Sequence, residues 1–339
     1  MSSTVARRSL VAGFAAALAT PSLLRSARGA TAEIRIARQI GLSYLPFDVM
    51  KERKLVEAEA ARRGASVSVN YLQFASGSSV NDAMISSNAD FGAVSLGPLL
   101  ALWERTRATT QFAGAAAVDA SAAVLNANQP RLKTLRDFGD ADRIAMPDVG
   151  VSYQALLLQM ACEKEFGEGH SKQLDPLTVS MPHPEAAAAL LGGRSEITAH
   201  FATAPFFFQE WDSGKVTRVI TSPEILGGPG TFIILASSRR YRDENRGAFA
   251  IVVSALAAAQ DWIAANREEA AQLYVAAQHS KLSPDFVTRM LRDPLIRYGS
   301  VPQNTMRIAE FSYRTGRIKT KVSDWQELFF EDIHDLPGS

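Results

Sequence analysis

One helix–turn–strand unit occurs twice in this chain, and this repetition constrains the fold more than any other feature of the sequence. The first copy spans 83–93 and the second spans 189–199, an offset of 106 positions (189 minus 83). Each copy has apolar helix residues, small turn residues, an acid and a strand, and each is followed by a proline, Pro98 or Pro205. Unless two ordinary helix–strand units agree by chance, the repetition predicts two similar lobes.

Two loops around the first copy offer backbone amides to a ligand. The loop 76–79 is Ser-Gly-Ser-Ser, and the loop 95–98 is Ser-Leu-Gly-Pro, and a helix begins at each. Unpaired amides and the helix dipole favour negative or partly negative oxygens at a helix N-terminus. Ser76, Gly77 and Ser95 are therefore candidate ligand contacts at the end of a strand, where open α/β sheets bind ligands.

Strands and helices alternate along the first part of the chain. Branched residues predict strands at 34–40 and 67–74, with a helix that starts at Pro46 between them. This alternation favours βαβ units and a mostly parallel sheet in an α/β fold. Tyr44 lies in the loop before the helix, where it either packs against that helix or lines a ligand cleft.

The chain is predicted to cross between the two lobes twice. The small apolar segment 115–125 is extended in character and forms the first crossing. The return crossing is expected near 219–226. The predicted lobes are therefore 33–118 together with 223–339, and 119–222.

The second lobe offers candidate ligand contacts of its own. A strand at 144–146 precedes a helix that Ser152 caps, and Ser152 either acts as a cap alone or also faces the ligand. A strand is predicted at 197–201. At its end His200 either donates to a ligand oxygen, which would make binding depend on pH, or is satisfied by a neighbouring carbonyl. Phe201 is placed to stack on a flat ligand.

The remaining pattern is mostly helical. A strand is predicted at 174–181, and Thr231 begins another strand at 231–236, where its hydroxyl can reach the cleft. Apolar residues at helical spacing predict helices at 247–265, 267–279, 285–291, 305–315 and 325–335.

The start of the chain resembles an export signal. Arg7 and Arg8 precede an apolar run and then small residues, so residues 1–32 are predicted to be removed, with cleavage between Gly29 and Ala32. The paired arginines fit a twin-arginine signal, and the general export route is the alternative. No other segment is expected to cross a membrane, and with Cys162 as the only cysteine no internal disulfide can form.

No catalytic or metal-binding pattern is present in the sequence. It contains no HExxH, Gly-x-Ser-x-Gly, Walker loop or dinucleotide fingerprint, and the five histidines lack ligand spacing. No catalytic residue, metal or cofactor is therefore predicted. A formal net charge of +1 over 339 residues also argues against a nucleic-acid partner. The segments assigned to the cleft lack Lys and Arg, so the ligand is expected to be a mono-anion or a polar neutral molecule.

Several segments together carry a family resemblance. The chain between about 34 and 264 resembles the periplasmic solute-binding proteins of ABC importers, in particular the nitrate/sulfonate/taurine group and its thiamine-pyrimidine-precursor-binding relatives. The resemblance rests on 41–55, 74–77, 89–94 with Pro98, 150–152 before 156–158, 184–186 leading to Glu196, and 230–232.

The resemblance implies a periplasmic-binding-protein type II fold, in which two α/β lobes joined by two crossing segments close on a ligand. It implies a monomeric receptor that serves a permease and its ATPase, with a receptor for a sensor as an alternative. It places these residues near the ligand: Tyr44, Ser76, Gly77, Ser95, Ser152, Thr198, Phe201 and Thr231.

The chain departs from the sulfonate binders at one place. Those proteins tend to have a Trp-x-x-Trp-Asp-Pro run where this chain has 198–205, so an aromatic or heterocyclic ligand is as credible as a sulfonate. The cysteine-rich motif of the related pyrimidine synthases is absent. The alternative function is an enzyme on the same bilobal fold that acts on a small pyrimidine or aromatic substrate.

Overall fold

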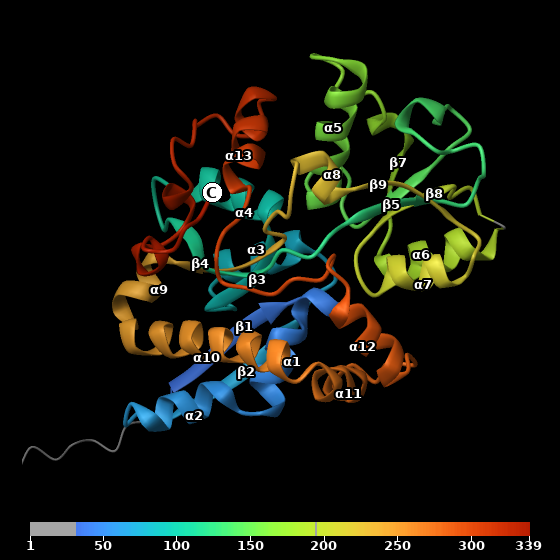
Figure 1. Ribbon diagram of the computed structural model, residues 1–339. Helices are drawn as coiled ribbons and strands as arrows, with labels where there is room; N and C mark the ends of the chain where they lie inside the picture. Colours follow the sequence, from blue (N-terminus) through green and yellow to red (C-terminus); the bar gives the residue numbers. More distant parts are fainter. Residues whose placement is uncertain (1–31, 194) are drawn as a thin grey trace, which may run out of the picture. The chain divides into compact units, whose positions relative to one another are not determined.

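The computed structural model describes residues 32–193 and 195–339, so the predicted export signal, apart from Ala32, lies outside the described residues. The described strands form two five-stranded sheets (Figure 1). The first sheet has the order β2-β1-β3-β10-β4. Its strands are β1 (Ala32–Arg38), β2 (Val67–Gln73), β3 (Phe91–Ser95), β4 (Phe112–Asp119) and β10 (Ile233–Ser238).

The second sheet repeats the arrangement of the first. Its order is β7-β6-β8-β5-β9. Its strands are β5 (Val124–Ala127), β6 (Ile144–Met146), β7 (Thr178–Ser180), β8 (Ala199–Ala202) and β9 (Thr217–Thr221). In each sheet a central strand pairs in parallel with two neighbours, β1 with β2 and β3, and β6 with β7 and β8. The common order confirms the expectation of two similar α/β lobes.

The prediction of a mostly parallel sheet is confirmed in strand direction, because four of the five strands in each sheet point the same way and one is reversed. β10 runs antiparallel to both β3 and β4, and β5 runs antiparallel to both β8 and β9. β10 and β5 are reversed because each is the strand on which the chain enters its sheet from the other lobe. The chain enters at the edge of the sheet where the parallel strands end. The chain passes between the sheets at 120–123 and again at 222–232. The exact lobe boundaries stay a prediction.

The helices pack on both sheets, and several begin close to the carboxyl ends of strands. In chain order they are α1 (Leu45–Glu52), α2 (Leu55–Arg62), α3 (Gly77–Ile85), α4 (Leu96–Thr106), α5 (Tyr153–Phe166), α6 (His183–Gly192), α7 (Phe206–Asp212), α8 (Ser222–Leu226), α9 (Arg239–Glu244), α10 (Arg246–Ala265), α11 (Arg267–Ala277), α12 (Pro284–Arg292) and α13 (Thr305–Arg314). Figure 1 shows α6 and α7 side by side against the second sheet, and α10 beside α1 and α2.

Two predicted elements differ from the structure. The expected strand 174–181 is a 3-10 turn, η3 (Asp175–Leu177), followed by the short β7, because Pro176 lies within the turn and cannot donate to a ladder. The expected helix 325–335 is two 3-10 turns, η4 (Trp325–Leu328) and η5 (Glu331–Ile333). Further 3-10 turns are η1 (Leu42–Tyr44) and η2 (Leu135–Asp137).

α10 corrects the expectation that no segment other than the predicted export signal is long and apolar enough to span a membrane. Its 20 residues are apolar enough to span a bilayer by length and composition alone. In the structure it is a core helix, because Phe249, Val252, Leu256 and Ile263 are buried on the face that packs toward α1, α2 and β4.

Candidate functional site

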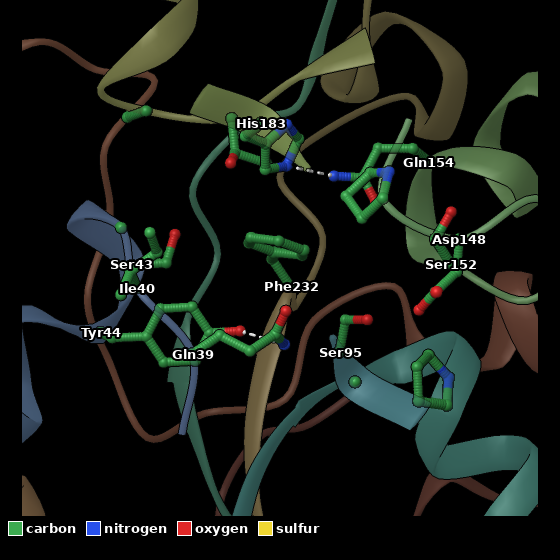
Figure 2. A pocket seen from close by; sticks show the side chains of 16 residues that line it. Gln39, Ile40, Ser43, Tyr44, Ser95, Asp148, Ser152, Gln154, His183 and Phe232 are labelled. Carbon is green, nitrogen blue, oxygen red and sulfur yellow. Dashed lines mark hydrogen bonds between the residues drawn. The ribbon is translucent and has the colours of Figure 1, made fainter. Parts of the chain in front are cut away.

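A pocket lies where the carboxyl ends of strands from both sheets come together. Residues that follow β1, β3, β6 and β8 line it, together with the first turns of helices and the segment before β10 (Figure 2). Its volume is ≈ 40 Å³, which is enough for a few water-sized groups. The lining residues are Gln39, Ile40, Gly41, Ser43, Tyr44, Gly77, Ser95, Pro98, Pro147, Asp148, Ser152, Gln154, His183, Thr203, Ala204 and Phe232.

The first lobe contributes hydroxyl groups that are available to a ligand. Ser95 is the N-cap residue of α4, yet its side chain accepts no capping hydrogen bond. The Tyr44 hydroxyl accepts a hydrogen bond from Gln39 Nε2 at 2.8 Å. Burial raises the pKa of Tyr44 far above its ordinary value, so the phenol keeps its proton and can donate it to a ligand.

Gly77 is required by the close packing of two helix N-termini. A Cβ atom at this position would lie 2.9 Å from Pro98 Cγ in the first turn of α4. Real Cβ contacts are longer, so a side chain at position 77 would push α3 and α4 apart. The glycine therefore allows both helix N-termini to face the same pocket.

The second lobe contributes a capping serine and a carboxyl group. Ser152 is the N-cap of α5, and its Oγ accepts a hydrogen bond from Ala155 N at 3.1 Å. Asp148 lies four residues before Ser152, in the loop that leads to α5. Burial raises the pKa of its carboxyl group, and the hydrogen bond from the Ser78 hydroxyl opposes this increase. Ser78 Oγ donates to Asp148 Oδ2 at 3.5 Å, which links α3 of the first lobe to the loop before α5.

Direct contacts join the two lobes around the pocket. The backbone N–H of Leu42 donates to Ala204 O at 3.2 Å. A Cβ atom on Gly97 would lie only 2.8 Å from Val151 O. Residues after β1 and β3 thus touch residues after β8 and β6, and the pocket is enclosed by backbone from both lobes.

Helix N-termini and hydroxyls dominate the electrostatics of the pocket. α3, α4, α5 and α6 all begin at it, and no lysine or arginine is among its lining residues. Helix N-termini favour negative charge, while the carboxyl group of Asp148 opposes it. This balance suits a mono-anion or a neutral polar group better than a multivalent anion.

An apolar hollow of ≈ 280 Å³ adjoins the pocket. The two share Gln39, Ile40, Pro147 and His183. The hollow adds Gln73, Phe74, Ala75, Pro182, Pro184 and Phe206. A ligand with a polar end in the pocket could therefore place an apolar part beside these rings.

Four of the predicted site residues line the pocket: Tyr44, Gly77, Ser95 and Ser152. Their contact with a ligand stays a prediction. Ser76 is outside the lining, and its Oγ caps α3 by accepting a hydrogen bond from Ser79 N at 3.3 Å.

The structure does not bring the other predicted residues to the pocket. Thr198 lies at the opposite end of β8, where its Oγ1 accepts a hydrogen bond from Arg143 N. Phe201 is fully buried in the core, and the Oγ1 atom of fully buried Thr231 accepts from Gln303 N. His200 is also fully buried and reaches the pocket only through His183, to which it is hydrogen bonded.

For His200 and Phe201 the cause is a change in the offset between the two lobes. α3 begins at Gly77 and α6 at His183, which preserves the offset of 106. The strand pairing differs, because Phe91 is the first partner of β1 and Ala199 is the first partner of β6, an offset of 108 (199 minus 91). Two extra residues lie in α6 and the loop after it, so Ser95 corresponds to Thr203.

Several pocket residues were not among the predicted contacts. His183 could have been found, because the 106-residue offset places it at the position of Gly77. Thr203 could not, because the offset changes between the helix and the strand. Gln39, Asp148, Gln154 and Phe232 have no sequence motif that marks them; only the packing of the lobes brings them together.

Comparisons with known proteins agree with this arrangement. The sequence model of the NMT1-like family matches residues 38–276. No curated protein matches the chain. Among solved structures, the aliphatic sulphonate binding protein SsuA from Escherichia coli is 17% identical with a TM-score of 0.67, over 89% of this chain and 93% of that one.

Two further solved structures are similar to this chain. The alkanesulfonate-binding protein SsuA from Xanthomonas axonopodis, bound to MOPS, is 20% identical with a TM-score of 0.68, over 87% of this chain and 97% of that one. The nitrate-binding protein NrtA from Synechocystis PCC 6803 is 16% identical with a TM-score of 0.67, over 86% and 83%. The chain therefore has the bilobal fold of the periplasmic binding proteins.

Proposed function

Because the chain belongs to the NMT1-like family, we propose that it is a solute-binding receptor that delivers a small organic ligand to the permease of an ABC importer. The single observation that carries this proposal is the pocket, which both lobes build from the carboxyl ends of their strands. A ligand there contacts both lobes at once. Such a ligand favours the closed arrangement of the lobes by its differential contacts, and the permease then recognises that arrangement.

The proposed ligand is a small sulfonate, carboxylate or heterocycle. Helix N-termini and the hydroxyls of Ser95 and Tyr44 suit an oxygen-bearing group. The ring of Phe232 lies near the centre of the pocket, with Tyr44 on one side and His183 on the other in the view of Figure 2. These rings support a ligand with a flat or apolar part.

The cellular setting is part of the same proposal. The similar structures include periplasmic proteins, and residues 1–32 have the pattern of a twin-arginine or general export signal. We place the receptor in the periplasm as a monomer, beside a permease and its ATPase. A receptor that serves a sensor would use the same pocket, and neighbouring genes for a permease and an ATPase would distinguish the two.

A second candidate function, an enzyme on this fold, is favoured by one observation. His183 lines the pocket and is hydrogen bonded to His200, which in turn contacts Glu210, and such a chain can move a proton. An enzyme would consume its ligand, whereas a receptor would bind it stoichiometrically.

A thermal-shift screen tests the receptor function. The mature chain is mixed with sulfonates, carboxylates, pyrimidines and aromatic acids, and each sample is then analysed by mass spectrometry for new products. We expect one compound class to raise the melting temperature, with about 2.7 kcal/mol of added stability at a ligand concentration 100 times Kd. No product should form. A product that accumulates with time would favour the enzyme, and a panel without any shift would contradict the pocket's role as a receptor site for these classes.

A further inference from the structure

A chain of hydrogen bonds runs from the pocket into the core of the second lobe. Gln154 Nε2 lies 3.2 Å from His183 Nε2, and His183 Nδ1 lies 2.8 Å from His200 Nε2. On its other side, His200 Nδ1 lies 2.6 Å from Glu210 Oε1. His200 and Glu210 are fully buried, so this is an ionisable pair without solvent contact behind a pocket residue.

The far end of the chain fixes the direction of its hydrogen bonds. The indole of Trp211 can only donate, and its Nε1 donates to Asn126 Oδ1 at 2.9 Å. Asn126 must therefore present its amide nitrogen to Glu210, and Nδ2 donates to Oε2 at 2.7 Å. Oε2 is thus an acceptor, and Oε1 shares a proton with His200.

The chain of hydrogen bonds has two states, which differ by one proton. With the extra proton, His200 donates from Nε2 to His183 Nδ1, so His183 carries its own proton on Nε2 and donates toward Gln154. Without that proton, His200 accepts at Nε2, so His183 is protonated on Nδ1 and its Nε2 accepts. Gln154 fits either state, because a half turn of its amide exchanges Oε1 and Nε2.

Burial favours the state with the extra proton. In that state the negative charge of Glu210 is balanced by a positive charge on His200, whereas the other state leaves a net negative charge in the core. His183 itself stays neutral, because burial, and secondarily the nearby His200, lowers its pKa. In that state the proton lies between Glu210 Oε1 and His200 Nδ1.

We propose that His200 and Glu210 are positioning residues that determine what Gln154 offers to the ligand. In the state with the extra proton, Gln154 turns its oxygen to His183 and its amide N–H groups to the pocket, where the ligand must supply an oxygen acceptor. Loss of the proton reverses the amide and turns its oxygen to the pocket. Gln154 is buried and lines the pocket, and its Oε1 has no hydrogen-bond partner among the described residues.

The other ionisable groups near these hydrogen-bonded residues do not supply or accept the proton that the two states differ by. Asp148 and Tyr44 line the same pocket as His183; burial raises the pKa of Asp148, and burial also raises the pKa of Tyr44, which keeps its phenol neutral. The remaining neighbours point to solvent or are paired: Glu185 on α6, Asp212 with Arg289, Lys215 after α7, and Arg218 with Glu224.

The test is histidine NMR on the ligand-free mature chain, with nitrogen chemical shifts followed from pH 5 to pH 9. The resonance of His183 is assigned from the H183Q variant. We expect Nε2 of His183 to be protonated at low pH and to lose its proton to Nδ1 as the pH rises. A protonation state of Nε2 that does not change over this range would overturn the proposal.

The variant E210Q separates positioning from a merely structural role. Its amide oxygen would accept from Asn126 and its amide nitrogen would donate to His200, so His200 would donate to His183 at every pH. We expect Nε2 of His183 to stay protonated throughout in E210Q. An E210Q chain that titrates like the wild type would contradict the proposal. E185Q, the same change on the exposed face of α6, is the control and should leave the titration of His183 unchanged.

The role assigned to Gln154 rests on the proposed receptor function, but the two can fail separately. The NMR titration uses no ligand, so a chain that binds nothing in the screen would still show the proton transfer. Should E210Q not fold, the wild-type titration alone decides the outcome.

Discussion

Two serines at the pocket begin helices, and they differ in what their hydroxyls do. Ser152 Oγ accepts a capping hydrogen bond from Ala155 N, whereas Ser95 Oγ accepts none in α4. Sequence alone marked both as candidate contacts, because a Ser before an apolar helix looks the same whether or not its hydroxyl is used by the backbone.

The two serines predict opposite outcomes for the same substitution. S152A should lower the free energy of unfolding by about 1 kcal/mol, since the α5 N–H loses its acceptor. S95A should leave stability unchanged. It should weaken the binding affinity by about tenfold for whichever screen compound raises the melting temperature, because that factor is the value of one hydrogen bond. Urea unfolding and isothermal titration calorimetry measure the two effects. Equal stability losses in both variants would show that Ser95 is also a cap.

Asp119 makes the stability depend on pH. It ends β4 where the chain leaves the first sheet, and its Oδ1 accepts from Ile233 N where the chain returns. Burial raises the pKa of Asp119 to about 7. Between pH 4 and 7 the folded state thus holds a proton that the unfolded state has released, so this group's contribution to stability falls as pH rises through that range.

D119N should remove this dependence, because an amide keeps the acceptor for Ile233 and cannot ionise. We expect the difference in unfolding free energy, D119N minus wild type, to increase from pH 4 to pH 7 by on the order of a few kcal/mol and then level off. Urea unfolding at a series of pH values measures it. A difference that is constant with pH would mean that Asp119 has an ordinary pKa.

At the scale of elements, α4 and the loop before α5 approach so closely that only glycine fits between them. Gly97 is the second residue of α4, and a Cβ there would lie 2.8 Å from Val151 O. Gly247 is the second residue of α10, and nothing lies within 4 Å of a Cβ built on it. The two glycines occupy the same helical position with different surroundings.

The same Gly→Ala change should therefore have opposite signs at these positions. G247A should stabilise the chain by up to about 1 kcal/mol, since alanine has the higher helix propensity. G97A should destabilise it by about 1–3 kcal/mol, because the backbone of Val151 must move. Thermal unfolding of both variants compares them. Stabilisation by G97A would show that the contact between the lobes yields at no cost.

Elements with strong periodicity were predicted well, and short ones were not. The predicted helix 247–265 is α10 to within one residue, because its apolar positions recur at helical spacing over five turns. The segment 325–335 has aromatic residues at a similar spacing but forms 3-10 turns. Phe329 packs against Gly114 of β4, and Phe330 packs against Phe249 of α10, so the two neighbouring rings are held by different elements. A short segment lacks enough internal hydrogen bonds to resist such contacts.

At the scale of the whole molecule, the C-terminal segment holds the two lobes together. The backbone N–H groups of Lys319 and Thr320 donate to Glu104 on α4 of the first lobe. Arg317 reaches the second lobe, where it donates to Gly150 O at 2.5 Å and twice to Gln159 Oε1.

R317M should cost about 2 kcal/mol of stability, because it keeps most of the side-chain volume but removes these charge-assisted hydrogen bonds. The control is R240M, which removes an exposed pair within α9 and should change stability by less than about 0.5 kcal/mol. Urea unfolding of both variants measures the costs. Equal and small decreases in the free energy of unfolding would show that the hydrogen bonds of Arg317 to the second lobe do not stabilise the protein.

The sequence by itself determined the repeated α/β unit, the two lobes and the capped helix N-termini, because these follow from local periodicity and from the chemistry of the residues that begin helices. Only the tertiary structure decided which of the candidate residues share a pocket. Two additional residues in α6 and the loop after it moved Phe201 and His200 into the core and brought Thr203 to the pocket, and no local pattern records that shift. The hydrogen-bonded chain behind Gln154 also joins residues 126, 154, 183, 200 and 210, whose proximity depends on strand order and register.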